Sequence, residues 1–530
     1  MVFSSVVFLF AFLPVALASY FALFVPYART RQPFWLRASN AALLFVSVLF
    51  YAWGEASMVF VLVGLTLLAY VCGRFVAPSH DLQAAAAAPA TASTTARNVG
   101  PGFFEAAGAS PGRRTISTRA KIVVGIAIVV HLVVLLSFKY AMLIGDSVGS
   151  VLQVFGVSNA QARAGTRAVV PLGVSFYALQ TLSYVIDVYR GTVRPSRQLL
   201  EFACYVSMFP QLVAGPIVRY RDIERELRTR SVPTDQFGEG ATRVIVGLAK
   251  KLLIADTLAQ LTDQVFNIPA EQLSAGIAWL GAFSGAVQIY FDFSAYSDIA
   301  IGLGRMLGFH FRENFDYPYA ARSITDFWRR WHISLSTWFR DYVYRSLGGA
   351  KGGRLRTYLN LLFVFVLVGL WHGANWTFAA WGFAHGVFIV IERAGLERWL
   401  RKLPGLLGQS YTLLVHVLSF AFFRASSLPY ALAFIGAMLG TAPGSAALHP
   451  PGMYLDVQTS ITLCVGCVLS QPILPWLEAR ASASRATSRA ALLGQAVLSL
   501  LRFAVLTAAL LACVAVLSVG THRPFIYFRF

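Results

Sequence analysis

The stretch Asp326–Gly349, DFWRRWHISLSTWFRDYVYRSLGG, followed by the run Leu370–Trp376, LWHGANW, decides how the rest of this chain is interpreted. Placed on a helix at about 100° per residue, the first stretch separates into an aromatic arc and a basic polar arc, with His332 at their border. A helix with two such faces is typical of the membrane interface. We therefore predict one amphipathic interfacial helix here, with His332 near the membrane surface. The aromatic arc comprises Phe327, Trp328, Trp331, Leu335, Trp338, Phe339 and Tyr342, and the polar arc comprises Arg329, Arg330, Ser334, Arg340 and Asp341.

The second histidine, His372, is predicted to lie deeper, because the segment between Arg356 and Glu392 contains no Asp, Glu, Lys or Arg. The helical residues from Arg356 to His372 reach about 24 Å into a hydrocarbon layer of about 30 Å. An imidazole at that depth should be neutral and able to accept a proton from a hydroxyl group. Asn375 adds an amide that could polarise a carbonyl group. The alternative is a structural histidine bonded to a backbone carbonyl, and the same alternative is preferred for His131, His385 and His416.

The aromatic and basic residues around His332 also have two interpretations. The tryptophans could form an interfacial aromatic belt with no role in chemistry. Arg329 and Arg330 could attract the phosphates of a cofactor, or only anionic lipid. The helix pattern alone does not separate these alternatives.

Composition indicates a polytopic membrane protein. Of the 530 residues, 57% are hydrophobic and only 13% are charged, and the mean hydropathy is +0.62. The formal net charge of +20 would favour nucleic acid binding in a soluble chain. Here the Lys and Arg residues cluster in short loops between apolar segments, which is the positive-inside pattern, so nucleic acid is not expected as a partner. Membrane lipids are expected as partners instead.

The chain divides into three predicted regions. Residues 1–77 should hold the N-terminal transmembrane helices, residues 78–118 a disordered linker rich in Ala, Ser, Thr, Gly and Pro, and residues 119–530 the core with the C-terminal transmembrane helices. Arginines follow the first apolar run and also lie near the end of the linker. They place the loop after the first helix and the linker in the cytoplasm. About eleven spans are expected, some of them short enough to be re-entrant.

Several other sequence features carry weaker signals. Asp292 and Asp298 lie in an apolar segment and are interpreted as packing or capping groups, and Lys250 and Lys251 as snorkelling lysines. Apolar segments interrupted by Pro and Gly, such as Phe209–Pro216, are expected to line a cavity. There is no Walker loop, no G-x-S-x-G nucleophile elbow and no predicted metal site. The pair Cys464 and Cys467 is interpreted as two packing residues.

The two opening motifs resemble those of the membrane-bound O-acyltransferase family. The resemblance is to the group that contains the alginate O-acetyltransferase membrane subunits and the enzymes for peptidoglycan, cellulose and D-alanyl transfer. It covers most of the chain from about Val169 onward. The matching stretches are Glu313–Gly349, Leu370–Gly386, Tyr290–Gly308, Gly247–Asp256, Phe209–Arg219 and Pro524–Phe530.

This resemblance implies an all-α polytopic fold, with transmembrane, re-entrant and interfacial helices around a central tunnel. It implies that residues 119–530 form the catalytic core and that the two family histidines are His332 and His372. It also implies an acyl thioester donor in the cytoplasm, acetyl-CoA or another thioester, with no tightly bound cofactor. The residues expected to contact substrate are Asn375, Trp371, Trp331, Arg329, Arg330, Asp326 and Ser336.

The expected function is therefore transfer of acetyl groups across the bacterial inner membrane for O-acetylation of an exopolysaccharide, with alginate the leading candidate. A periplasmic O-acetyltransferase is the expected partner protein. His372 is expected to act as general base or transient acyl carrier, and His332 to orient it or share that role. One alternative keeps the fold and changes the acceptor to peptidoglycan or cellulose, or the transferred group to D-alanyl. A non-enzymatic alternative is a transporter or flippase for a lipid-linked sugar.

Overall fold

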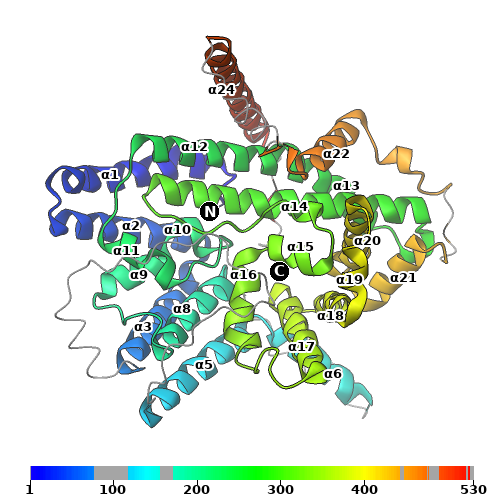
Figure 1. The fold of residues 1–530 in the computed structure, drawn as a ribbon, viewed down its shortest axis with the longest axis horizontal. Coiled ribbons are helices and arrows are strands. Elements are labelled where there is room, and N and C mark those ends of the chain that lie inside the picture. Colours follow the sequence, from blue (N-terminus) through cyan, green and yellow to red (C-terminus); the bar gives the residue numbers. More distant parts are fainter. Residues whose placement is uncertain are drawn as a thin grey trace.

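The structure is a computed structural model that describes residues 2–76, 117–154, 171–441, 444, 447–473, 475–476, 489–520 and 523–525. Within these ranges the chain is helical and contains no strand. Figure 1 shows a broad bundle in which helices of very different tilt cross one another. The predicted linker at 78–118 lies almost entirely outside the described residues.

Six described helical segments are long and apolar enough to cross a membrane, and this confirms the predicted all-α polytopic fold class. The shorter apolar helices Leu428–Met438 and Val457–Leu469 add to them. The remaining helices of the core are shorter or carry charged residues, so these criteria count fewer spans than the eleven predicted. The six segments are Phe8–Thr30, Pro33–Val76, Thr118–Phe138, Arg354–His372, Gly405–Arg424 and Ser499–Ser518.

The N-terminal helices follow the apolar runs of the sequence. α1 (Leu13–Thr30) continues the π-helical turn η1 (Phe8–Phe12), and α2 (Pro33–Glu55) packs against it. A short 3-10 turn then leads into α3 (Val59–Val76). The turn between α1 and α2 is made at Arg31, which has a φ of 56°.

The next helices place the far end of α5 near the centre of the molecule. α5 (Thr118–Phe138) leads directly into α6 (Ala141–Val154). α8 (Val174–Tyr189) packs against both α3 and α5. It is a regular helix from Val174 onward and follows a turn at Pro171–Gly173.

A buried helix pair runs through the middle of the bundle. α12 (Thr234–Ala249), the π-helical turn η3 (Lys250–Ala255) and α13 (Asp256–Phe266) form one continuous rod. α14 (Ala275–Met306) packs along it, and Figure 1 shows the two crossing the upper half of the view side by side.

The stretch predicted as one interfacial helix is broken instead. It forms α15 (Ile324–Arg330), α16 (Ile333–Trp338) and the π-helical turn η6 (Phe339–Tyr344), with the break at His332. The prediction of one amphipathic helix with a surface histidine was therefore wrong. Ser334 and Asp341, expected on its polar face, are also buried.

α17 (Arg354–His372) and α18 (Trp376–Ile391) then pack tightly together. A Cβ added at Gly369 would collide with the Phe378 carbonyl, and one at Gly382 with the Phe365 carbonyl. The two backbones touch because both positions are glycine, as small residues allow in membrane helices. The remaining helices are α9 (Leu199–Ser207), α10 (Phe209–Leu212), α11 (Tyr220–Arg228), η7 (Glu392–Leu396), α19 (Glu397–Leu400), α20 (Gly405–Arg424), α21 (Leu428–Met438), α22 (Val457–Leu469) and α24 (Arg489–Ser518), together with the 3-10 turns η4 (Ala270–Gln272), η5 (Pro318–Ala320) and η8 (Pro451–Met453).

Candidate active site

His332 lies at the break between α15 and α16, where the backbone turns sharply inward. Its φ of 44° is in the left-handed region, which is uncommon for a residue other than glycine and often marks a functional site. The neighbouring loop supports this turn, because the backbone N–H of Ile333 donates to the Asn314 carbonyl at 3.0 Å. The side chain is fully buried, at 0% exposure.

The hydrogen bonds of Asn314 fix the proton position on His332. The backbone N–H of Ser334 can only donate, and it lies 3.2 Å from Asn314 Oδ1, so the amide oxygen must face this side. His332 Nδ1 is 3.2 Å from the same oxygen and must therefore be the protonated nitrogen. In the neutral ring, Nε2 then carries the lone pair.

His372 has the same tautomer for a different reason. It is the last residue of α17, and its Nδ1 lies 2.7 Å from the Val368 carbonyl one turn earlier. A carbonyl oxygen only accepts, so Nδ1 donates and Nε2 carries the lone pair. This is the backbone contact expected of a structural histidine.

The two histidines meet in the interior. Their ring centroids are 6.1 Å apart, although the residues are 40 positions apart in the sequence. Trp371 lies beside both, with its ring 5.6 Å from His332 and 5.1 Å from His372. His372 is 2% exposed, so both imidazoles belong to one buried centre.

The end of α17 that carries His372 is capped by the turn between α5 and α6. Lys139 Nζ donates to the Trp371 carbonyl and lies 3.3 Å from Ser175 Oγ. The Tyr140 hydroxyl donates to the Leu370 carbonyl at 2.9 Å. The last carbonyls of a helix have no partner within the helix, and a cation there is favourable. Lys139 and Tyr140 therefore fix the turn from which His372 projects.

The start of α15 is held from the opposite side by Glu392. Its carboxylate accepts from the backbone N–H groups of Ile324 and Thr325, at 2.6 and 2.8 Å, and from the Tyr411 hydroxyl at 3.1 Å. The Ser323 hydroxyl accepts from a third N–H group, that of Asp326. These contacts satisfy the first N–H groups of a short helix and so help to position His332.

The predicted substrate residues fall into two groups. Trp371 lies at the histidine pair, and Trp331 is buried among aromatic rings, 5.4 Å from Phe327 and 5.8 Å from His416. The others make structural contacts elsewhere or are exposed. Asn375 caps α18 and bonds the Ser426 carbonyl, Arg330 pairs with Asp326 and Asp316, Ser336 donates to the Trp331 carbonyl, and Arg329 is exposed.

The buried charges near α14 form ion pairs. Lys251 is 2.7 Å from both Asp256 and Asp292, and Lys250 is 2.7 Å from Asp298. The interpretation of Lys251 as a snorkelling lysine was wrong, because its ammonium group is buried against two carboxylates. The other buried histidines are hydrogen bonded. His131 bonds Ala127 and Thr181, His385 bonds Trp328 and Ser419, and His416 bonds Tyr319.

Sequence reasoning missed Asn314, Lys139, Tyr140 and Glu392. Asn314 lies in the Glu313–Gly349 stretch that carries the family resemblance, so that motif was the available signal. Lys139 was detectable as a lysine at the end of an apolar run. Its partner is more than 200 residues away, and no local pattern connects the two.

Comparison with known proteins identifies the family of this chain. The sequence profile described as "MBOAT, membrane-bound O-acyltransferase family" matches residues 193–423. A "Probable alginate O-acetylase AlgI" of Pseudomonas aeruginosa is 41% identical over 438 residues, which is 83% of this chain and 75% of the relative. The protein of the same name from Azotobacter vinelandii is also 41% identical, over 83% of this chain and 78% of its own. A "Peptidoglycan O-acetyltransferase" of Helicobacter pylori is 35% identical over 51% of this chain and 57% of its own.

The similarity to the AlgI proteins extends well beyond the two histidine motifs, into most of the chain. The matched profile contains both His332 and His372 and most of the helices that hold them. This multi-pass membrane chain is therefore an acyltransferase and belongs to the membrane-bound O-acyltransferase family.

Proposed function

We propose that this chain passes acetyl groups from a cytoplasmic thioester, with acetyl-CoA the leading donor, across the bacterial inner membrane for O-acetylation of an exopolysaccharide. Alginate is the leading acceptor. The observation that carries the proposal is the buried pair His332 and His372, whose ring centroids are 6.1 Å apart. The names of the AlgI relatives support alginate as the polymer.

His372 is the proposed general base. Its Nε2 lone pair takes the proton of an acceptor hydroxyl while the hydroxyl oxygen forms an ester bond with the thioester carbonyl carbon. The carbon–sulfur bond then breaks, and the proton passes to the departing thiolate. A positioned base of this kind contributes about 10² to 10⁴ in rate.

His332 is the proposed second member of the pair. Its Nδ1 is held by Asn314, so its Nε2 is the nitrogen that can share the proton or orient the reacting group. Trp371 contacts both rings and is the proposed wall of the site. A covalent acetyl-His372 intermediate is the alternative role for the same lone pair. Acid quenching during turnover, followed by mass analysis of the protein, distinguishes these two roles.

The final step is transfer of the acetyl group to the acceptor polymer. A separate periplasmic O-acetyltransferase would complete transfer to the polysaccharide. Peptidoglycan is the second candidate acceptor, because one relative is named as a peptidoglycan O-acetyltransferase.

The test uses inside-out membrane vesicles that contain the full chain. Labelled acetyl-CoA is added outside, and alginate with the periplasmic partner is enclosed inside. Ester-bound label on alginate is the expected result. Label on enclosed peptidoglycan fragments, but not on alginate, supports the second acceptor. Vesicles that consume no acetyl thioester contradict the proposed function and favour a transporter.

A further inference from the structure

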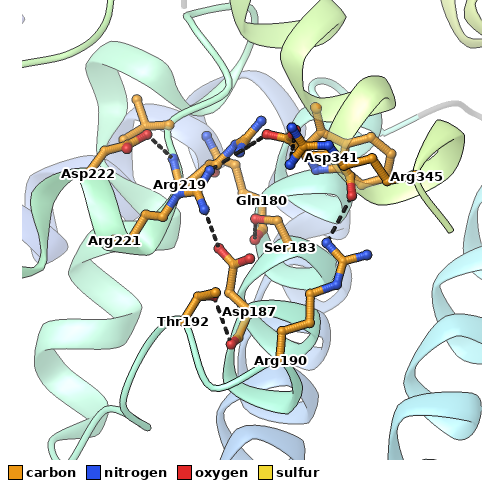
Figure 2. Close-up of polar contacts among 12 residues, drawn as sticks. Gln180, Ser183, Asp187, Arg190, Thr192, Arg219, Arg221, Asp222, Asp341 and Arg345 are labelled. Carbon is orange, nitrogen blue, oxygen red and sulfur yellow. Dashed lines mark hydrogen bonds and ion pairs between the residues drawn. The ribbon is translucent and has the colours of Figure 1, made fainter. Parts of the chain in front are cut away.

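A second charged site lies at one end of α8, where five arginines gather around one carboxylate. We call Arg190, Arg219, Arg221, Arg340 and Arg345 the arginine cluster, and Figure 2 shows its centre. Asp341 accepts from Arg219 at 2.8 Å and from Arg340 at 2.9 Å. Arg345 and Arg221 lie 3.2 and 3.8 Å from its oxygens. Arg190 donates to its backbone carbonyl at 2.8 Å.

The arginine cluster has more positive charge than its acids can neutralise. Asp341 and Asp187 are the two carboxylates that face it, with Asp187 4.0 Å from Arg221. Five guanidinium groups against two carboxylates leave three positive charges unmatched. Asp222 also contacts the cluster, because it accepts from the backbone N–H of Arg219 at 3.3 Å. Arg312, at 2.5 Å, balances its charge, so the excess of three is unchanged. Burial acts to raise the pKa of Asp341, but the hydrogen bond from Arg340 and the charge of Arg219 hold this pKa well below its usual range. The carboxylate is therefore ionised and already included in this count.

Two buried polar groups beside Asp341 lack hydrogen-bond partners within the part of the chain that the structure describes. Arg219 is 2% exposed, and its Nη2 atom has no acceptor. Gln180 is 0% exposed, and neither its amide nitrogen nor its amide oxygen has a partner. Buried polar groups are nearly always hydrogen bonded, because desolvation without a partner is costly. Figure 2 shows the two side chains near each other, and a bound anion could accept from the Arg219 Nη2 and Gln180 amide N–H groups.

The arginine cluster is connected to the histidine pair by two helical segments. Asp341 follows His332 by nine residues along α16 and η6, which corresponds to about 13 Å. α8 begins beside Lys139, at Ser175, and carries Asp187 in its last turn. Trp338 Nε1 donates to the Leu179 carbonyl at 3.0 Å and joins the two segments midway.

The cluster also lies on the face predicted to be cytoplasmic. The hydroxyl of Tyr70 in α3 donates to the carbonyl of Arg197, just beyond α8, at 3.0 Å. The ends of α3 and α5 that meet the predicted cytoplasmic linker are adjacent, since Arg119 stacks on Phe75. The rim of the cluster is open on this face, where the side chains of Arg221 and Arg345 are 32% and 41% exposed.

A purely structural role would require fewer arginines. One bidentate arginine satisfies a buried carboxylate, whereas Asp341 has four guanidinium groups around it. An excess of guanidinium groups, one of them with an unsatisfied donor, is typical of a site that binds phosphate, whose oxygens arginine recognises.

We propose that the arginine cluster binds the phosphate of a phosphopantetheine arm and so directs the thioester at the end of that arm toward His332 and His372. This inference rests on the proposed function and names the class of donor that it uses. The phosphopantetheine arm is shared by coenzyme A and by acyl carrier proteins. Both therefore present the same phosphate and the same thioester to this face.

The test compares donors that differ in this phosphate, using the full chain in lipid vesicles. S-acetyl-4′-phosphopantetheine carries the phosphate and S-acetylpantetheine lacks it. For the natural sequence we expect kcat/KM to be higher with the phosphorylated donor by about tenfold or more, as for loss of a hydrogen bond to a charged group. The double variant Arg221→Gln/Arg345→Gln should lose most of this preference, mainly through KM.

Arg225→Gln is the matched control, because Arg225 is exposed on α11 one turn beyond Arg221. This control should keep the preference within about twofold. Melting curves verify that all variants fold. We expect them to fold because the substituted side chains of Arg221 and Arg345 lie at the rim of the cluster. Equal use of the two donors by the natural sequence, or an unchanged preference in the double variant, overturns the proposal. Failure of the natural sequence to use any acetyl thioester overturns the proposed function instead.

A third arm identifies the source of the phosphate. Acetyl-CoA and an acetylated carrier protein are compared at equal concentration, and both should depend on Arg221 and Arg345. The donor with the higher kcat/KM is the source. Insensitivity of both donors to the double variant contradicts the role of the cluster.

Discussion

His332 and His372 lie with their ring centroids 6.1 Å apart, and each donates its Nδ1 proton to a fixed oxygen of the protein. The lone pairs of the two imidazoles are therefore both on Nε2. Asn314 provides the oxygen for one histidine, and the helix backbone provides it for the other. Both rings therefore have the lone pair on Nε2, although different oxygens hold them in that tautomer.

Asn314 should be a positioning residue for His332. Asn314→Ala removes the acceptor of Nδ1–H, so the imidazole is no longer held in one tautomer, and kcat should fall about tenfold or more. Asn314→Asp retains an acceptor and should rescue part of this loss. Ser297→Ala is the control, because Ser297 contacts only the amide nitrogen, at 3.1 Å. Steady-state kinetics check this, and an unchanged kcat in Asn314→Ala contradicts it.

Lys139 should support the turn that carries His372. Lys139→Met keeps the chain length but leaves the Trp371 carbonyl without its donor, which should destabilise the protein by about 1–3 kcal/mol. The kcat should fall with little change in the donor KM, because the base moves while the donor contacts remain. Lys121→Met, at the exposed start of the same helix, is the control. Equal melting temperatures and kcat values in the two variants would argue against this role.

Glu392 should stabilise α15 through its charge. Glu392→Gln keeps the shape but removes the negative charge at the helix N-terminus, and we expect a loss of about 1–2 kcal/mol. Glu397→Gln removes a surface pair with Arg401 and should cost no more than about 0.5 kcal/mol. Denaturation of the two variants in detergent provides the comparison. A larger loss of stability in Glu397→Gln than in Glu392→Gln would contradict this role of Glu392.

His310 should make stability depend on pH. The hydrogen bond to Glu226 raises the pKa of His310, at a site outside the candidate membrane spans. A raised folded-state pKa gives stabilisation that is complete below the unfolded pKa of about 6.5 and is lost as pH rises through the folded value.

His310→Gln should therefore lower the melting temperature at about pH 5.5 and have less effect at about pH 8.5. The side chain is exposed, so the effect should be small. Thermal unfolding at both pH values measures it. A larger effect at the higher pH has the wrong sign for this mechanism.

Much of the fold was predictable because apolar runs of sufficient length must form helices in a membrane. The apolar runs of the N-terminal region form α2 and α3 in this way. The break at His332 was not predictable from periodicity. Neither glycine nor proline marks it, and its left-handed backbone depends on contacts with the loop around Asn314.

The histidine pair was predictable from family resemblance, whereas its surroundings were not. The helix pattern placed His332 at the surface because it assumed one continuous helix, and the break buries it instead. Arg329 and Arg330 were candidate contacts for phosphate, or for anionic lipid, because they lie on the basic face of the predicted interfacial helix. The arginines that gather in space come from α8, α11 and η6, and only the tertiary structure brings them together.

The most direct test of the catalytic pair is acetyl transfer by His372→Ala and His332→Ala in vesicles, with membrane insertion and protein level matched to the natural sequence. His385→Ala is the control for removal of a buried histidine, because His385 bonds Trp328 and Ser419 and lies outside the pair. We expect the rate of label transfer from acetyl thioester to polysaccharide to fall by about 10² or more in His372→Ala and to be impaired in His332→Ala. Transfer at the natural rate in a correctly inserted His372→Ala protein would contradict the assignment of the active site.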